Sequence, residues 1–449
     1  MMAIVLAAIE VTIVSTAMPT IVRDLGNIHL MSWVFAIYLL ATAITTPIYG
    51  KLADLFGRKK VFTIGIVIFL IGSSLCSLAH SMAHLIFFRA IQGIGAGALF
   101  PVSLTIIGDI FNIEERAKIQ GLISAIWFIS GILGPLVGGF IVDLLSWHWI
   151  FLINIPFGLL SISLIKLFFH EQFTKKKRYI DYPGAITFTI GMTSLLYAII
   201  LGGQNKAWIS PITLSLLINA VGFLSLFYFI ELKSPEPILP LNLFKLPMVM
   251  VPNLATFFLC TVLIGLNVYL PIWVQGVLSY KATGSGIALI PMSVGWTLGA
   301  FYCGKLLMKF SVRNTTSLGA GAILAGCSLL VAMGFSIFEL IFGMFIIGLG
   351  FGLALTSSGI VIQSSVEWNL RGSATALFTF TQALGQTVGV AMLGVLFYHT
   401  VSTGSATLNK EVLTFGLHNI FIALSVISVL GLFINLWIPK QKLSGSKLL

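Results

Sequence analysis

Charged residues are scarce in this 449-residue chain. Asp, Glu, Lys and Arg make up 9% of the residues, whereas hydrophobic residues make up 58%. Soluble domains contain about a quarter charged residues, so the composition excludes a water-soluble fold. The chain has 25 Lys and Arg against 14 Asp and Glu. This basic excess would suggest nucleic-acid binding only if the basic side chains formed one patch.

Several kinds of chemical site are also missing from the sequence. The four cysteines lie inside apolar runs without CxxC spacing, which predicts small hydrophobic side chains rather than metal ligands or disulfides. All seven histidines lie at span ends or in connections, and no pair has a usable zinc-ligand spacing. There is no P-loop, so ATP is not the expected energy source. No connection is long enough for a soluble catalytic domain. We therefore expect no enzyme activity, no cofactor and no bound metal.

Long apolar runs fill most of the chain instead. A window of about 19 residues finds fourteen stretches able to cross a hydrocarbon core of about 30 Å. About 20 of the 25 basic residues fall in alternate connections and the two tails, so the positive-inside rule places these segments in the cytoplasm. The basic excess is thus a topology signal, and nucleic acid is not an expected partner. The sequence predicts an all-α, multi-pass protein of the cell membrane with both termini in the cytoplasm.

Short motifs recur far apart in the chain, which indicates an internal repeat. The tripeptide Gly-Lys-Leu at 50–52 recurs at 304–306, 254 residues later, and the glycines at 93, 95 and 97 recur at 348, 350 and 352, 255 residues later. The alternative explanation is the general preference of membrane spans for small residues. We expect two related six-helix bundles, residues 1–170 and 247–449. Between them, residues 171–246 would form a cytoplasmic linker and two inserted transmembrane helices.

Glu10 is the only acidic residue predicted near the bilayer centre. Arg89 is the corresponding basic residue, predicted to lie inside a span and not in a connection. An ionised carboxylate there costs on the order of 2.5 kcal/mol or more, so it must face a wet cavity, find a cation or take up a proton. Such a group can alternate between a proton and a cationic ligand. Guanidinium keeps its charge, so Arg89 should pair with a carbonyl, with Gln92 or with a nearby carboxylate. A permanently paired or neutral Glu10 and a purely structural network around Arg89 are the alternatives.

The basic connection at residues 50–60 contains one acid, Asp54. A topogenic cluster needs only bases, so the acid requires a partner. We expect ion pairs between Asp54 and Arg116 and between Arg58 and Asp109, which would latch the cytoplasmic ends of the spans in one state. The predicted gating residues are Lys51, Asp54, Gly57, Arg58, Asp109 and Arg116.

The fifth span contains a run of glycines beside a proline. Gly134 and Gly138 leave one helix face without side chains, and Pro135 frees a carbonyl and bends the helix. We expect a conformational seam here, although glycines alone are explained by close packing. The predicted seam comprises Gly134, Pro135, Gly138 and Gly139.

Together these motifs resemble the fourteen-span drug:proton antiporter family of the major facilitator superfamily, over essentially the whole chain. GKLADLFGRKK (50–60) resembles the superfamily's cytoplasmic gating motif, RAIQG (89–93) its proton-coupling motif, and the stretch around Pro135 the motif associated with antiporters. WHWIFLINIPFG (147–158) is similar to a sequence typical of the fourteen-span branch, with His148 where arginine is usual. The first span resembles the family's acidic motif: Thr12 and Pro19 match, Glu10 replaces an aspartate, and Ser15 replaces an asparagine.

The resemblance implies a major facilitator fold of two six-helix bundles plus two inserted helices. It also implies a proton-coupled exporter of amphipathic, mainly cationic or zwitterionic drugs that works by alternating access in the lipid bilayer. We expect the protein to function as a monomer. Glu10 would hold the proton or the drug's charge, and Arg89 would couple the two. Four aromatic residues are candidates for cation–π contact with flat drugs. The full set of expected drug contacts is Glu10, Trp33, Tyr38, Gln92, Trp127, Asn154 and Trp296. A proton-coupled importer of a nutrient or organic anion and a non-transporting receptor are the alternatives.

Overall fold

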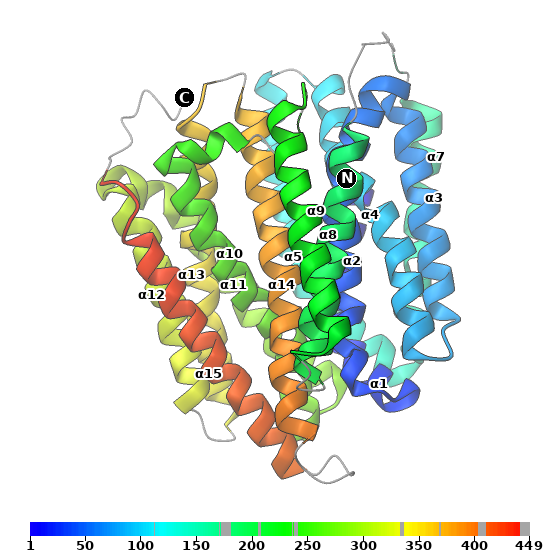
Figure 1. Cartoon of the computed structure of the whole chain (residues 1–449), viewed down its shortest axis with the longest axis vertical. Helices are drawn as coiled ribbons and strands as arrows, with labels where there is room; N and C mark the ends of the chain where they lie inside the picture. Colours follow the sequence, from blue (N-terminus) through cyan, green and yellow to red (C-terminus); the bar gives the residue numbers. More distant parts are fainter. Residues whose placement is uncertain are drawn as a thin grey trace. The chain divides into compact units, whose positions relative to one another are not determined.

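The computed structural model describes residues 1–111, 113–169, 171, 181–204, 208–235, 237, 241–332, 336–367, 370–402 and 410–440. Within these ranges the chain forms helices and connections, without strands (Figure 1). Fourteen of its helical segments are long and apolar enough to cross a membrane. The predictions of an all-α membrane protein and of fourteen spans are therefore confirmed.

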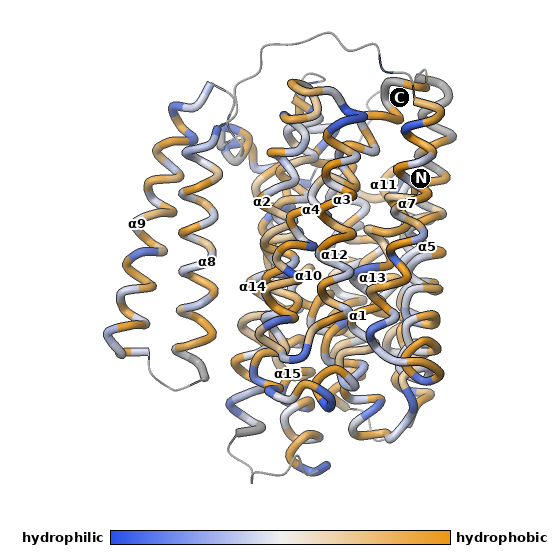
Figure 2. Tube along the Cα trace, turned by 90° about the vertical axis from the view of Figure 1, so that its right-hand side faces the viewer, coloured by the Kyte–Doolittle hydropathy of each residue, from blue (hydrophilic) through white to orange (hydrophobic). Residues whose placement is uncertain are grey.

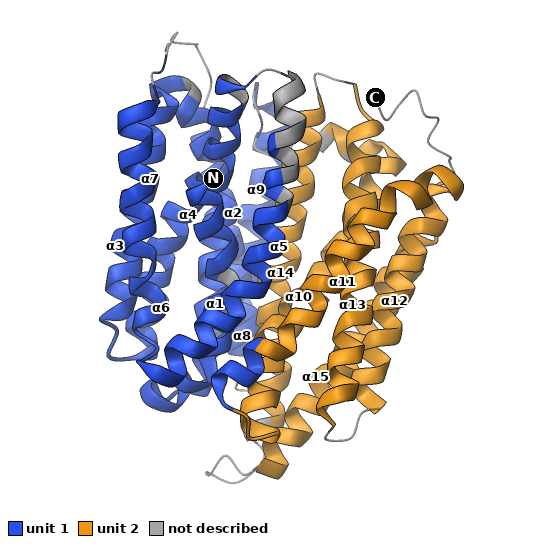
Figure 3. Cartoon of the chain, turned by 180° about the vertical axis from the view of Figure 1, so that it is seen from behind, with its two compact units in different colours: residues 1–238, 281–286 blue, residues 239–280, 287–449 orange. Residues whose placement is uncertain are grey.

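The chain divides into two compact units, shown in different colours in Figure 3. The first unit comprises Met1–Ile238 and Lys281–Gly286, and the second comprises Leu239–Tyr280 and Ile287–Leu449. The helices that begin in the first unit are α1 (Met2–Leu25), α2 (Met31–Phe56), α3 (Arg58–Ser77), α4 (Met82–Ile110), α5 (Ile113–Leu144), α6 (Trp149–Leu152), α7 (Asn154–Phe168), α8 (Tyr182–Gln204), α9 (Pro211–Lys233) and α11 (Ala282–Lys309). Those of the second unit are α10 (Pro247–Ile272), α12 (Val312–Ala332), α13 (Ile337–Ser364), α14 (Arg371–Ser402) and α15 (Lys410–Asn435). Short turns are η1 (Ile28–Leu30), η2 (Leu241–Lys245) and η3 (Trp273–Val277).

Glycines at repeated positions bring corresponding helices together in each unit. A Cβ atom on Gly93 of α4 would overlap the backbone of α2, and one on Gly95 would overlap α3. A Cβ atom on Gly348 of α13 would overlap α11, and one on Gly350 would overlap α12. Since small residues allow helix backbones to approach closely, the motif has the same packing role in both units. The repeated spacing therefore reflects repeated structure as well as composition.

A second pair of repeated glycines shows the same correspondence. Gly134 of α5 packs against Thr12 of α1, and Gly389 of α14 packs against Thr261 of α10. In both places a Cβ atom on the glycine would overlap the threonine side chain. The contact of α1 with α5 thus has its counterpart in the contact of α10 with α14.

The two inserted helices, α8 and α9, form a hairpin within the first unit. The rings of Phe188 and Phe227 have centroids 5.2 Å apart across the hairpin. Tyr197 of α8 contacts Trp33 of α2, with ring centroids 5.9 Å apart. Figure 2 shows the hairpin standing beside the other helices of its unit. The predicted boundaries at residues 170 and 246 fall just after α7 and just before α10. The division into three parts stays a prediction.

Candidate functional site

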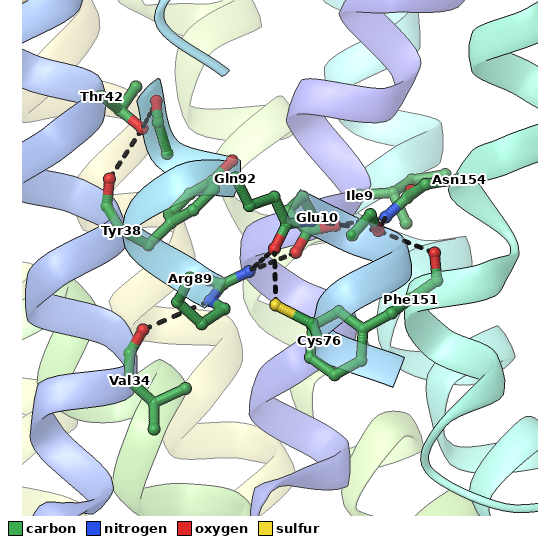
Figure 4. A network of polar contacts seen from close by, with 12 residues as sticks. Ile9, Glu10, Val34, Tyr38, Thr42, Cys76, Arg89, Gln92, Phe151 and Asn154 are labelled. Atoms are coloured by element: carbon green, nitrogen blue, oxygen red, sulfur yellow. Dashed lines mark hydrogen bonds and ion pairs between the residues drawn. The ribbon is translucent and has the colours of Figure 1, made fainter. Parts of the chain in front are cut away.

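Glu10 lies on α1 with its side chain completely buried inside the first unit (Figure 4). Arg89, on α4, forms an ion pair with Glu10 through Nη1 and the carboxylate Oε1. Asn154, the first residue of α7, donates from Nδ2 to Glu10 Oε2 at 2.8 Å. Both carboxylate oxygens therefore have a partner, and three of the predicted site residues lie in direct contact.

Arg89 is also surrounded by partners. Its side chain is 1% exposed, so its charge needs compensation from within the protein. Besides the ion pair, Nη1 donates to Gln92 Oε1 at 2.8 Å and Nε donates to the carbonyl of Val34 at 3.3 Å. The guanidinium carbon lies 4.0 Å from the centroid of the Tyr38 ring, a cation–π contact. The structure thus places Tyr38 and Gln92 around Arg89.

A residue of α3 that the sequence analysis did not select completes this network. Ser73 Oγ accepts hydrogen bonds from Gln92 Nε2 at 3.3 Å and from Asn154 Nδ2 at 2.9 Å, and donates to the carbonyl of Phe151 at 2.8 Å. One turn later, Cys76 Sγ lies 3.7 Å from Gln92 Oε1. Helices α1, α3, α4 and α7 therefore share one buried polar network.

The sequence of α4 explains how the network is assembled. Arg89 and Gln92 are three residues apart, so their side chains lie on the same face of the helix. A Cβ atom on Gly72 of α3 would overlap the backbone of Gln92, and Gly93 meets α2 in the same way. Glycines in α3 and α4 thus let the neighbouring helices come close enough for these polar side chains to meet.

The carboxylate of Glu10 has no contact with solvent in this conformation, since the residue is 0% exposed. Three solutions were expected for this charge: a wet cavity, a cation or a proton. Here the solution is the cation Arg89. Contact between Glu10 and a drug would require this ion pair to open, so the drug-binding role of Glu10 stays a prediction.

The three tryptophans expected to contact drugs have other neighbours. Trp33 packs against Tyr197. Trp127 is 46% exposed and makes an edge contact with Phe100, with ring centroids 6.0 Å apart. Trp296 belongs to the second unit, where it stacks on Phe351 at 5.4 Å. The aromatic drug site that we expected from these residues stays a prediction.

The predicted gating motif, residues 50–60, contacts a residue outside it, Glu171. Gly57 joins α2 to α3 with a φ of 90°, a conformation that favours glycine. Glu171 accepts hydrogen bonds from the first amides of α3, those of Arg58 at 2.6 Å and Lys59 at 3.1 Å. In return, Lys59 Nζ donates to the carbonyls of Lys166 and Phe169 at the end of α7, both at 2.9 Å. Each helix end thus receives the charge that its dipole favours.

The two ion pairs predicted for the gate are not tested. The side chains of Asp54, Asp109 and Arg116 lie outside the described residues. Lys51 lies in the last part of α2, and Arg58 begins α3. The pairs of Asp54 with Arg116 and of Arg58 with Asp109 therefore stay predictions.

Replacing Glu171 should loosen the start of α3. We expect Glu171→Ala to lower the free energy of unfolding by about 1 kcal/mol, the usual cost of losing a helix N-cap. Glu171→Gln should cost less, because one acceptor oxygen remains. Thermal unfolding of the purified protein in detergent measures both, with the exposed Glu367→Ala as the control. Equal stability of Glu171→Ala and the wild type would contradict this capping role.

The predicted seam on α5 has two separate contact faces. Gly134 and Gly138 face α1, where added Cβ atoms would overlap Thr12 and Thr16. Gly139 instead faces the first turn of α11, at Ala282. Pro135 lies beside Gly286 of the same turn. The structure therefore shows why small residues are needed on two faces, whereas movement at the seam stays a prediction.

The Trp-His-Trp motif connects the end of α5 to the end of α1. Trp147 is buried, and its Nε1 donates to Asp24 Oδ2 at 3.1 Å. The His148 ring stacks on Trp147 with centroids 3.7 Å apart. Burial of this ring lowers the pKa of His148, and the nearby charge of Asp24 opposes the shift. His148 therefore supplies less positive charge near neutral pH than the arginine usual at this position.

The chain is similar to several known transporters. It matches the Major Facilitator Superfamily over residues 1–390. It is 38% identical over 403 residues to Multidrug resistance protein 3 of Bacillus subtilis (strain 168), covering 88% of this chain and 78% of that protein. It is 32% identical over 449 residues to Multidrug efflux pump SdrM of Staphylococcus aureus (strain N315), covering 98% of this chain and 96% of that protein.

Solved structures support the same fold at low sequence identity. The nucleoside transporter NupG has a TM-score of 0.70 at 13% identity, covering 98% of this chain and 99% of that one. A D-xylose-proton symporter has a TM-score of 0.67 at 14% identity, covering 98% of this chain and 96% of that one. The predicted major facilitator fold is confirmed. With fourteen candidate spans and a family match that extends over most of its length, the chain belongs to the Major Facilitator Superfamily.

Proposed function

We propose that this protein is a proton-coupled multidrug efflux antiporter of the cell membrane. It exports amphipathic, mainly cationic or zwitterionic drugs by alternating access. Two relatives that align with most of the chain are named as a multidrug resistance protein and a multidrug efflux pump. The site geometry supports coupling to protons through the buried pair of Glu10 and Arg89.

The observation that supports this mechanism best is the burial of the ion pair between Glu10 and Arg89. A proton on Glu10 would remove the negative charge that holds Arg89. Arg89 would still keep Gln92 Oε1, the carbonyl of Val34 and the face of Tyr38 as partners. The neutral carboxyl group would then be free to separate from Arg89. In the reverse step, loss of the proton leaves a carboxylate that attracts either Arg89 or the positive charge of a drug.

We further propose that the termini face the cytoplasm. The basic connections support this orientation, because positively charged segments remain inside. It places the turn at Gly57 on the cytoplasmic side, and the end of α5 with the start of α11 on the outer side. The protein would work as a monomer.

The expected stoichiometry follows from a single carboxylate, that of Glu10, which binds either a proton or the positive charge of a drug. One proton would enter per monovalent cation exported, so the exchange would move no net charge. The pH gradient alone would then drive monocation export, at about 1.4 kcal/mol per pH unit. Zwitterions and neutral drugs would also gain about 2.3 kcal/mol per 100 mV from the membrane potential. Dications should be poor substrates.

Vesicles containing the purified protein test this prediction when pH and voltage are clamped separately. A pH gradient without voltage should drive uphill transport of a monovalent cationic dye. A voltage without a pH gradient should drive only zwitterionic and neutral drugs. Voltage-driven monocation transport would refute the stoichiometry, and no uphill transport under any gradient would refute the proposed function.

A further inference from the structure

Asp143, at the last turn of α5, binds the first turn of α11. Its carboxylate accepts hydrogen bonds from the amide of Ala282 at 3.1 Å, the amide of Thr283 at 2.9 Å and the hydroxyl of Thr283 at 2.6 Å. The partners are about 140 residues apart in the chain, yet the carboxylate takes the place of a helix N-cap. The negative charge also suits the positive end of this 28-residue helix.

Glycines make this contact possible. A Cβ atom on Gly139 would overlap the backbone at Ala282, and one on Gly286 would overlap the backbone at Pro135. The two helices therefore touch backbone to backbone over one turn of α11. This contact lies within the first unit, which includes residues 281–286.

The contact of Asp143 differs from the Glu10 network in its exposure. Asp143 lies at the surface and Thr283 is only partly covered. When the helices separate, water can replace the carboxylate at the amides and can hydrate the carboxylate itself. Gly139 and Gly286 themselves have no side chains to be released. These properties suit a contact that forms and breaks repeatedly.

We propose that Asp143 and the first turn of α11, residues 282–286, form an outer latch. The latch holds the ends of α5 and α11 together while the transporter is closed to the outside, and it releases when the outer side opens. Asp143 is a positioning residue, because it acts on the helix ends and not on the drug or the transported proton. The proposal rests on the orientation and the alternating access of the proposed function.

Cysteine labelling at the contact measures the opening of the outer latch. Ala282 is buried, and the four native cysteines are also buried. An Ala282→Cys protein should therefore react slowly with a membrane-impermeant thiol reagent added outside intact cells. Asp143→Ala should raise the labelling rate on the order of tenfold, because the hydrogen bonds to a charged group are lost. Asp143→Asn should give an intermediate rate, since one acceptor oxygen remains.

A matched control is Glu411→Ala, which removes an exposed acid from the first turn of α15. This variant should leave the labelling of Ala282→Cys unchanged. An unchanged rate in Asp143→Ala would overturn the proposal. If the wild-type protein exports drugs while this rate is unchanged, only the latch fails. If the wild-type protein shows no uphill export, the proposed function fails as well.

A reversible cross-link provides the second test. In an Asp143→Cys, Thr283→Cys double variant, oxidation should form a disulfide across the latch and stop drug export. Reduction should restore the export measured before oxidation. Each single variant, oxidised in the same way, controls for damage elsewhere. Undiminished export by the cross-linked protein would overturn the proposal, because the latch would not need to open.

Discussion

Glu10→Gln is expected to abolish uphill drug export. The amide has nearly the shape of the carboxyl group and can still accept hydrogen bonds from Asn154 or Arg89. It can neither bind a transported proton nor attract a cation. In cells that express this variant, dye accumulation should rise to the level of cells that lack the transporter. Purified Glu10→Gln protein should also release no protons when a cationic drug is added, whereas the wild type should release them.

Loss of folding is the obvious alternative cause of such a result. Removing one partner of a buried ion pair costs about 3–5 kcal/mol, because the remaining charge is left uncompensated. Two further variants separate the causes. Glu10→Asp keeps the charge and should retain part of the export. A Glu10→Gln, Arg89→Gln double variant removes both charges, so it should recover stability without recovering transport.

Uphill export by Glu10→Gln would show that the ion pair is structural. That outcome corresponds to the alternative left open by the sequence, in which Glu10 is permanently paired for helix packing. Proton coupling would then have to reside elsewhere. Because Glu10 is completely buried in this conformation, the experiment distinguishes a carboxylate that only holds helices together from one that couples export to protons.

The meeting of Glu10 and Arg89 could be anticipated because charges deep in a membrane are costly. Each stands out against an apolar span, and neither can remain unpaired at low cost. The conformational state could not be anticipated in the same way. Whether the carboxylate faces water or Arg89 depends on how the helices pack at that moment, and the sequence is the same in both states.

Ser73 and Glu171 illustrate what sequence analysis misses. A single serine costs little in a membrane span, so Ser73 gave no signal although it joins Gln92 to Asn154. Acids are ordinary in connections, so Glu171 gave no signal either. Its role depends on the fold, which brings the end of α7 next to the start of α3. The two contacting residues, Arg58 and Glu171, are more than 100 residues apart in the chain. The predicted gating motif was selected because several bases surround one acid, Asp54, and its gating role stays a prediction.

The sequence also gives little signal for the residues that contact drugs. Aromatic residues are common in membrane spans, where they pack against lipid or against each other. Trp33 and Trp127 contact Tyr197 and Phe100 respectively. Tyr38 differs because its ring covers the guanidinium of Arg89. A nearby buried charge therefore predicts the contacts of an aromatic residue better than the residue's position in a span does.

Arg89→Lys is expected to reduce drug export on the order of tenfold or more although the positive charge is kept. Arginine uses Nη1 for Glu10 and Gln92, Nε for the carbonyl of Val34, and its flat face for Tyr38. Lysine has one ammonium group and cannot reproduce this arrangement. Buried lysine can also lose its proton, which would remove the charge that competes with the drug. Export of a dye from cells, corrected for protein amount, measures the loss.

Arg89→Ala should have a larger effect and should resemble Glu10→Gln. Without the guanidinium, Glu10 loses the cation that replaces its proton in the proposed cycle. Drug addition to the purified variant should then release no protons at neutral pH. Arg23→Lys serves as the control, because Arg23 is 77% exposed and its charge is hydrated. Wild-type export by Arg89→Lys would mean that charge alone matters at this position, and wild-type proton release by Arg89→Ala would mean that Arg89 does not couple the two ligands.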